Sequence, residues 1–239
     1  MKLAPFAFAT AIVGLAATVA FGVAPPPPIT TQVEPRWQPR TPKGPHGPLF
    51  EASRARVLAA RVTTCGSSIV VSAVELAPGY VVVPAAGRGA RRVQLLGWSG
   101  SRSAEETVVA RSALGRPSYG AVLLQIQGAP ALPILPTTLP SQGAPRWALS
   151  GALGTSPEPR LGSVYGTTPA RLGGIHTRLA MVEPSSLEPA AALVDQSGSL
   201  DLIVVDRDAA GRPLAAVPGA IVRATGEPVV SCTAVVPDS

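Results

Sequence analysis

The sequence is poor in the residues that acid–base catalysis most often uses. It has two histidines and two lysines among 239 residues, and charged residues make up 14% of the chain. A serine hydroxyl is a weak nucleophile near neutral pH unless a positioned base accepts its proton. The histidine and lysine bases are His46, His176, Lys2 and Lys43, and both lysines lie near the N-terminus. This shortage raises the question of whether the chain is an enzyme.

Cysteine and aromatic residues are scarce as well. There are two cysteines, and aromatic residues make up 4% of the chain. Because no further cysteine and no nearby histidine could complete a ligand set, we expect neither a metal nor a cofactor. The net charge is +6, but no basic block is interleaved with aromatic residues. The sequence therefore predicts no nucleic-acid partner.

A long apolar run occupies the N-terminus. Residues 3–24 carry no charge, and such a run is long enough to cross a hydrocarbon core of about 30 Å. The small-x-small triplet at 22–24 is followed by Pro25, which signal peptidases generally do not accept. We therefore expect an uncleaved, single-pass membrane anchor over residues 1–24, with a cleaved signal peptide as the alternative. Either one would place the rest of the chain in the periplasm or cell envelope.

A proline-rich linker follows the apolar run. Residues 25–48 hold nine prolines, a density that disfavours helix and central strand and favours extended polyproline conformations. His46 is expected to be a solvated residue of this linker. Residues 49–239 then form one domain, which contains both cysteines. In an oxidising compartment such a pair is most simply one disulfide, Cys65 to Cys232, with two free thiols as the alternative.

Short β-prone runs separated by Gly, Pro and Ser fill the domain from residue 57 onward. Their spacing of about 8 to 15 residues favours an antiparallel barrel or sandwich over alternating βαβ units. One short helix is expected at 49–60, before the first strand. The expected strands are 68–76, 80–83, 92–98, 107–110, 121–126, 146–151, 163–168, 177–182, 202–205, 214–217 and 220–223.

Two stretches of the domain resemble the first barrel of trypsin-like serine proteases. They are residues 65–68 (Cys-Gly-Ser-Ser) and 77–87 (Ala-Pro-Gly-Tyr-Val-Val-Val-Pro-Ala-Ala-Gly). They are most similar to the membrane-anchored periplasmic members of this chymotrypsin-fold superfamily in actinobacteria, and the similarity extends over about residues 57–232. The resemblance implies an all-β fold of two six-stranded antiparallel barrels, with the catalytic residues in the cleft between them. It also implies a disulfide between the start and the end of the domain.

The catalytic positions that the resemblance implies are degenerate. The family's histidine falls on Ala86. Its aspartate, at the start of an Asp-hydrophobic-Ala-hydrophobic-Leu strand, falls on Tyr119. The family's Gly-Asp-Ser-Gly turn resembles residues 195–199 (Asp-Gln-Ser-Gly-Ser), which places the nucleophile at Ser197, with Ser199 as the alternative register.

These replacements favour a function without hydrolysis. Loss of a member of the triad leaves at most about 10³- to 10⁴-fold acceleration over water. His176 is interpreted as an exposed or hydrogen-bonded strand histidine. We therefore expect an exported, membrane-anchored pseudoprotease that binds a peptide or protein in the inter-barrel cleft, or that supports an envelope complex. Two alternatives stay open: a serine hydrolase with an unusual catalytic set centred on Ser197, and an unrelated exported β domain with a structural or binding function.

Overall fold

The computed structural model describes residues 44–98, 100–151, 156–224, 226–230 and 232. The expected anchor and most of the expected linker lie outside these residues. Among the residues described, no helix is both long and apolar enough to span a bilayer. The chain divides into a unit of residues 1–40 and a unit of residues 41–239, and the β domain lies in the second unit.

Strands dominate the described part of the chain. The helical segments are α1 (Pro48–Ala55), the 3₁₀ turn η1 (Ala85–Gly87) and α2 (Pro218–Ile221). The first group of strands is β1 (Val57–Thr63), β2 (Ser68–Ala77), β3 (Tyr80–Pro84), β4 (Arg92–Leu96), β5 (Glu106–Ala113) and β6 (Ala121–Ile126). The second group is β7 (Pro145–Leu149), β8 (Arg160–Leu172), β9 (Ile175–Glu183), β10 (Ala192–Val194), β11 (Leu200–Arg207) and β12 (Pro213–Ala216), followed by the short β13 (Glu227–Pro228).

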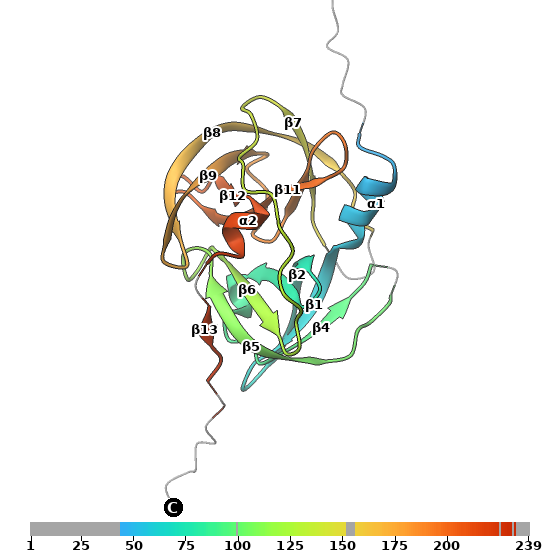
Figure 1. The fold of residues 1–239 in the computed structure, drawn as a ribbon, viewed down its shortest axis with the longest axis vertical. Coiled ribbons are helices and arrows are strands. Elements are labelled where there is room, and N and C mark those ends of the chain that lie inside the picture. The colour runs from blue at the N-terminus through green and yellow to red at the C-terminus, as the bar shows by residue number, and fades with distance from the viewer. Residues whose placement is uncertain (1–43, 99, 152–155, 225, 231, 233–239) are drawn as a thin grey trace, which may run out of the picture. The chain divides into compact units, whose positions relative to one another are not determined.

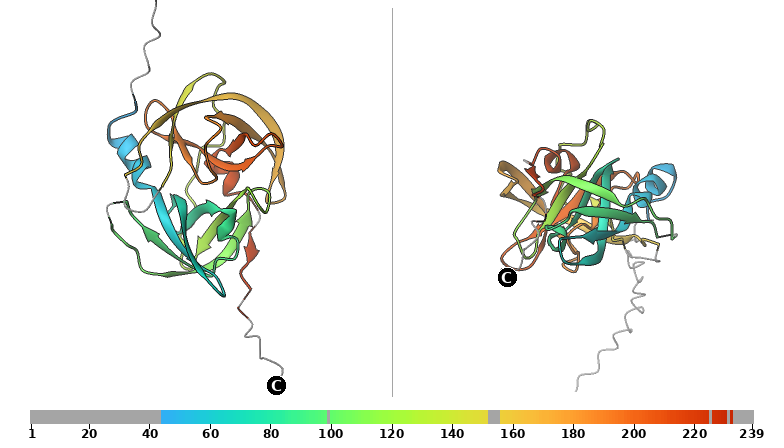
Figure 2. Two further views of the ribbon diagram at one scale, coloured as in Figure 1. Left: turned by 180° about the vertical axis from the view of Figure 1, so that it is seen from behind. Right: turned by 90° about the horizontal axis from the view of Figure 1, so that it is seen from below.

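The strands form two antiparallel bodies that lie side by side (Figures 1 and 2). The first is a seven-stranded sheet in the order β13-β5-β4-β1-β2-β3-β6, in which β6 also pairs with β5. The second is a closed six-stranded barrel in the order β10-β11-β12-β9-β8-β7. The all-β class and the second barrel are confirmed. The first body differs from the expected six strands because β13 returns from the second body and pairs with β5.

Two expected elements are wrong in ways that have physical causes. The stretch 220–223 was expected to be a strand, but α2 covers its beginning and has Pro218 in its first turn, where the fixed φ of proline suits a helix. The helix expected at 49–60 ends at Ala55, because residues 57–60 belong to β1 and pair with β2 on one side. On the other side β1 pairs with β4. The expected strand 121–126 coincides with β6.

The predicted disulfide joins the two ends of the domain. Cys65 and Cys232 are bonded, with 5.7 Å between their Cα atoms and a sequence separation of 167 residues. Cys65 lies between β1 and β2, and Cys232 follows β13. The bond therefore holds the C-terminal segment beside the first sheet. There the backbone of β13 pairs with that of β5, and Glu227 lies opposite Arg111 in the strand register.

Candidate functional site

The positions that the resemblance assigns to the histidine and the aspartate lie together. Ala86 is in η1, directly after β3, and Tyr119 ends the turn before β6. The N–H of Ala85 donates to the carbonyl of Gly120 at 2.8 Å, which brings the two segments into contact. Ala86 is exposed, and Tyr119 is 59% exposed. An alanine methyl group cannot accept a proton, and a tyrosine phenol is a poor base near neutral pH.

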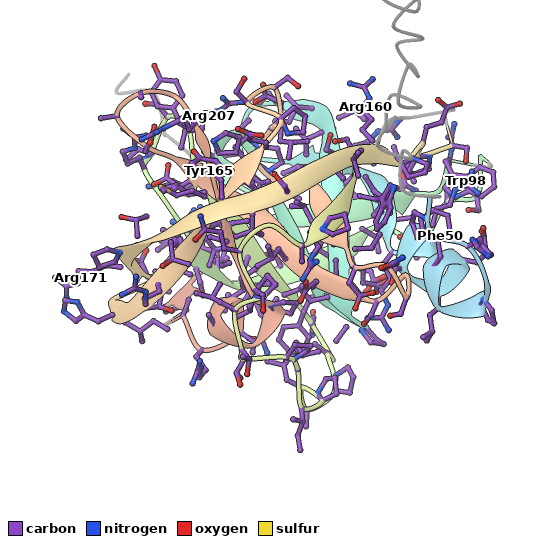
Figure 3. All side chains as sticks on the ribbon, turned by 90° about the horizontal axis from the view of Figure 1, so that it is seen from above. Phe50, Trp98, Arg160, Tyr165, Arg171 and Arg207 are labelled. Atoms are coloured by element: carbon purple, nitrogen blue, oxygen red, sulfur yellow. A yellow bond between two sulfur atoms is a disulfide. The ribbon has the colours of Figure 1, made fainter. Side chains whose placement is uncertain are left out.

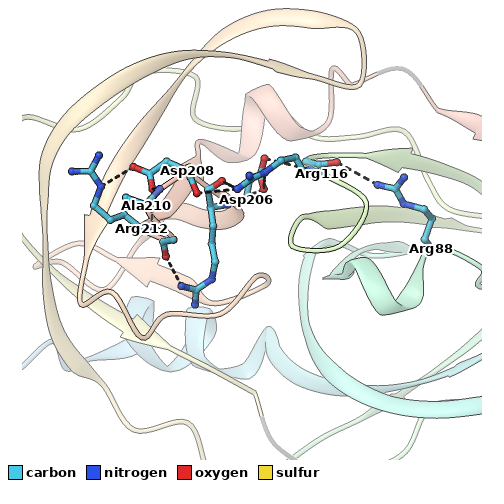
Figure 4. A network of polar contacts seen from close by, with 9 residues as sticks. Arg88, Arg116, Asp206, Asp208, Ala210 and Arg212 are labelled. Carbon is cyan, nitrogen blue, oxygen red and sulfur yellow. Dashed lines mark hydrogen bonds and ion pairs between the residues drawn. The ribbon is translucent and has the colours of Figure 1, made fainter.

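The turn that carries Tyr119 contacts the second barrel through Arg116. Its backbone N–H donates to Oδ2 of Asp206 at 3.3 Å, and its Nε donates to Oδ1 at 3.4 Å. Its Nη2 also donates to the carbonyls of Arg207 and Asp208. Figure 4 shows this polar seam between the first sheet and the C-terminal end of β11. The histidine and aspartate positions therefore adjoin the end of β11.

Ser197 lies in the tight turn between β10 and β11. Oδ1 of Asp195 accepts hydrogen bonds from the Ser197 hydroxyl at 2.6 Å, from the Ser197 N–H at 2.8 Å and from the Ser199 N–H at 3.0 Å. Gly198 has a φ of 88°. A Cβ at Gly198 would lie 2.5 Å from the backbone nitrogen of Phe50, so α1 packs directly on this turn.

This placement corrects the expectation that Ser197 shares a cleft with the histidine and aspartate positions. Its turn precedes β11, whereas the seam with Asp206 lies near the end of that strand. The eight residues of β11 span about 25 Å at roughly 3.3 Å per residue. In Figure 3, Phe50, which packs on the serine turn, and Arg171 lie on opposite sides of the molecule. The alternative register at Ser199 is in the same turn. The hairpin connection thus keeps both serines away from the expected site.

A different segment of the second barrel lies at the C-terminal end of β11. The guanidinium of Arg207 donates to the carbonyl of Ser185 at 3.1 Å, to the carbonyl of Leu187 at 2.7 Å and to the carboxylate of Glu188 at 3.1 Å. These bonds hold the β9–β10 connection beside the seam. The connection carries two exposed serines, Ser185 and Ser186. Sequence reasoning missed it because a Ser-Ser pair without a neighbouring glycine carries no nucleophile signal.

A cavity of about 610 Å³ opens between the first sheet and the second barrel. We call it the cleft. The β8–β9 hairpin forms one wall and reaches the first sheet, where the Gly173 N–H donates to the carbonyl of Ala113 at 3.0 Å. Residues from both bodies line the cleft, among them Gly115, Arg116, Arg171, Gly174, Asp206 and Glu227.

Neither histidine lines the cleft. Nδ1 of His46 lies 3.1 Å from the carbonyl of Gly44, in an exposed turn before α1. His176 is exposed on β9, where it lies opposite Arg171 of β8 in the strand register. Its position as an exposed strand histidine was predicted.

The turn after β11 is fixed by a carboxylate. The Asp208 side chain accepts hydrogen bonds from the backbone N–H groups of Ala210 and Arg212 and from the guanidinium of Arg212. These bonds lower the pKa of Asp208 below its usual value, and the bond from the Arg212 backbone N–H has the largest effect. The Asp208 carboxylate is therefore ionised near neutral pH. Its contacts with Ala210 and Arg212, drawn in Figure 4, stabilise the turn.

The fold is that of the trypsin-like and HtrA-type serine proteases. The chain superposes on the Rv3671c protease of M. tuberculosis in its active form with a TM-score of 0.53 and 14% identity, over 76% of this chain and 86% of that one. An inactive form of the Rv3671c protease gives a TM-score of 0.52 and 16% identity, over 76% and 95%. A variant of the HtrA-type protease AlgW with a decapeptide gives 0.52 and 14%, over 73% and 63%. No family model and no curated protein sequence matches the chain.

Proposed function

We propose that the chain is a membrane-anchored, exported homologue of the trypsin-like proteases, related to their actinobacterial members, that lacks hydrolytic activity and binds a peptide or protein segment in the cleft. The observation that carries this proposal is the replacement of the base and of the residue that orients it. Ala86 and Tyr119 adjoin the seam at the cleft, and neither histidine lines it. Without the histidine base, acyl transfer to a serine lacks the usual route for the proton.

The surroundings of the exposed serines offer no replacement for the missing histidine base. The Ser197 hydroxyl donates to Asp195 at 2.6 Å, within a turn that uses the same carboxylate to bind two backbone N–H groups. The Asp195 carboxylate therefore stabilises the turn, and the turn is remote from the cleft. Ser185 and Ser186 lie in the connection that Arg207 holds, and among the described residues neither serine has a hydrogen bond to a histidine. Binding without cleavage is the function that these groups support.

The cleft has the size and position of a ligand site. Its volume of about 610 Å³ falls within the range of about 300–1,000 Å³ that is usual for ligand pockets. It lies between two bodies of strands, and both contribute charged side chains. A peptide segment suits such a cleft better than a large protein surface does, because the β8–β9 hairpin bounds it on one side.

Anchoring and export rest on the sequence. Residues 3–24 are long and apolar enough to span a bilayer, and the proline-rich linker after them would hold the domain outside the membrane. The disulfide agrees with an oxidising compartment. Alkaline extraction of membranes should leave the full chain in the membrane pellet, whereas a cleaved signal peptide would release the domain into the soluble fraction.

A fluorophosphonate probe tests the absence of hydrolase activity. We expect the full chain to show no labelling above that of its heat-denatured form. Labelling that disappears in Ser197→Ala would instead support the serine hydrolase centred on Ser197. Labelling that disappears in Ser185→Ala or Ser186→Ala would place an active nucleophile in the β9–β10 connection and would equally overturn the proposal.

A further inference from the structure

Two of the charged residues at the cleft are already neutralised by each other. Arg116 binds Asp206 through both its backbone N–H and its Nε, and it also binds the carbonyls of Arg207 and Asp208. Asp206 accepts a further hydrogen bond from the N–H of Arg207 at 2.8 Å. Because Arg116 and Asp206 already pair with each other and with the backbone, they are less available to a ligand than an unpaired charge would be.

Two nearby backbone acceptors are occupied as well. The carbonyl of Ala113 accepts the N–H of Gly173 at 3.0 Å. The carbonyl of Gly115 accepts Nη2 of Arg88 at 3.3 Å. A ligand that extends one of the sheets needs unpaired backbone groups along an edge. With these two carbonyls paired, the side chains that line the cleft are the stronger candidates for recognising a ligand.

Two side chains at the cleft retain their binding capacity. Arg171, at the tip of the β8–β9 hairpin, is exposed, and within the described part of the chain its guanidinium makes one hydrogen bond, a 3.5 Å contact with the carbonyl of Gly174 in its own turn. Glu227 of β13 is exposed, and its carboxylate makes no hydrogen bond or ion pair with another described residue. Both line the cleft. One belongs to the second barrel and the other to the strand added to the first sheet.

We propose that the cleft binds a short peptide segment with one acidic and one basic group, and that Arg171 pairs with the acidic group while Glu227 pairs with the basic group. This inference rests on the proposed function of peptide binding. The two charges have opposite sign and come from opposite bodies, so they also set the direction of the peptide: its acidic group lies toward the second barrel and its basic group toward β13. Guanidinium–carboxylate pairs suit this task because they add geometric specificity to attraction.

The test uses the full chain in nanodiscs to select from a displayed random-peptide library, with empty nanodiscs as background. We expect enriched peptides to contain one acidic and one basic residue at a fixed spacing. R171E should weaken binding of those peptides about tenfold and should enrich peptides in which a basic residue replaces the acidic one. E227K should exchange the basic residue for an acidic one. R178E is the matched control, because Arg178 is exposed on the same hairpin but binds Thr167 and does not line the cleft.

The outcomes separate the two proposals. If no peptide is enriched over empty nanodiscs, peptide binding fails and the charge assignment fails with it. If peptides are enriched without charged residues, or if R171E and E227K select the same peptides as R178E, peptide binding stands and the charge assignment is overturned. Both substitutions are at exposed positions, and unchanged thermal unfolding will confirm that the variants are folded.

Discussion

The ion pair between Arg146 and Asp201 allows a quantitative test of the barrel. Nε of Arg146 lies 2.5 Å from Oδ2 of Asp201, and the two side chains are 10% and 17% exposed. The pair joins β7 to β11, two strands of the second barrel. Replacing Arg146 with Met keeps much of the side-chain volume and leaves the carboxylate without its partner.

The cost of this change follows from burial. Removing one partner of a fully buried pair costs about 3–5 kcal/mol, because the other charge stays in a poor environment. Asp201 keeps some contact with solvent, so we expect Arg146→Met to lower the free energy of unfolding by about 2–4 kcal/mol. For a domain of this size that corresponds to a melting temperature lower by about 4–16 °C.

The dependence on pH identifies the cause. Burial raises the pKa of Asp201 above its usual value, and the charge of Arg146 opposes this in part. Without Arg146 the pKa of Asp201 in the folded state rises further. A carboxyl with a raised folded-state pKa favours folding below its unfolded pKa, and this contribution is lost as the pH rises through the folded pKa. The deficit of Arg146→Met should therefore be largest at neutral pH and smallest near about pH 4.

Thermal unfolding at several pH values measures this deficit. Asp201→Asn, combined with Arg146→Met, removes the unpaired charge, so the double variant should recover part of the stability at neutral pH. Arg178→Met is the control, since Arg178 is exposed and binds Thr167 rather than a carboxylate. A deficit that is the same at pH 4 and pH 7, or one that Arg178→Met reproduces, would refute this reasoning.

Three further predictions concern the same domain. Gly198→Ala should destabilise the domain more than Gly211→Ala. Both glycines have positive φ, so an alanine at either position adds a backbone strain of about 1–2 kcal/mol. A Cβ at Gly198 would also clash with the α1 backbone, whereas one at Gly211 would meet nothing within 4 Å. Equal denaturation midpoints would contradict this. Replacing Cys65 and Cys232 with serine should lower the free energy of unfolding by up to about 5 kcal/mol, because the bond closes a long loop; an unchanged midpoint would count against it. Burial raises the pKa of Glu75, so the wild type should lose stability as the pH rises through that pKa while Glu75→Gln does not. Parallel curves of melting temperature against pH would disprove this.

The strands were predictable where the sequence repeats a local pattern. The run 121–126, bounded by a turn, coincides with β6. The boundary between α1 and β1 was not predictable, because residues 49–60 contain no glycine or proline to end a helix. β1 becomes a strand through pairing with β2 and β4. β13 is two residues long and includes Pro228, so its pairing with β5 has no local signature.

The serine turn was misplaced because one local signature serves two structures. A hairpin turn favours an aspartate that binds backbone N–H groups and a glycine with positive φ. Asp195 and Gly198 meet these needs between β10 and β11. A nucleophile turn has a similar sequence, so residues 195–199 fit both descriptions. Strand pairing distinguishes them, and it depends on residues far along the chain. Arg171 and Glu227 likewise meet at the cleft only through the tertiary fold.

The separation of Ser197 from the cleft makes the two functional questions independent. In an active protease of this fold, the nucleophile and the peptide site coincide, so labelling of the serine also reports access to the cleft. Here the serine turn packs on α1, whereas the cleft lies beyond the other end of β11. A fluorophosphonate that reacted with Ser197 would therefore reveal a second site beside α1 and would leave the charge preference of the cleft unchanged. Conversely, a peptide that saturates the cleft should not protect Ser197 from reagents. The cleft therefore has to be tested by binding and Ser197 by labelling, and neither measurement can replace the other.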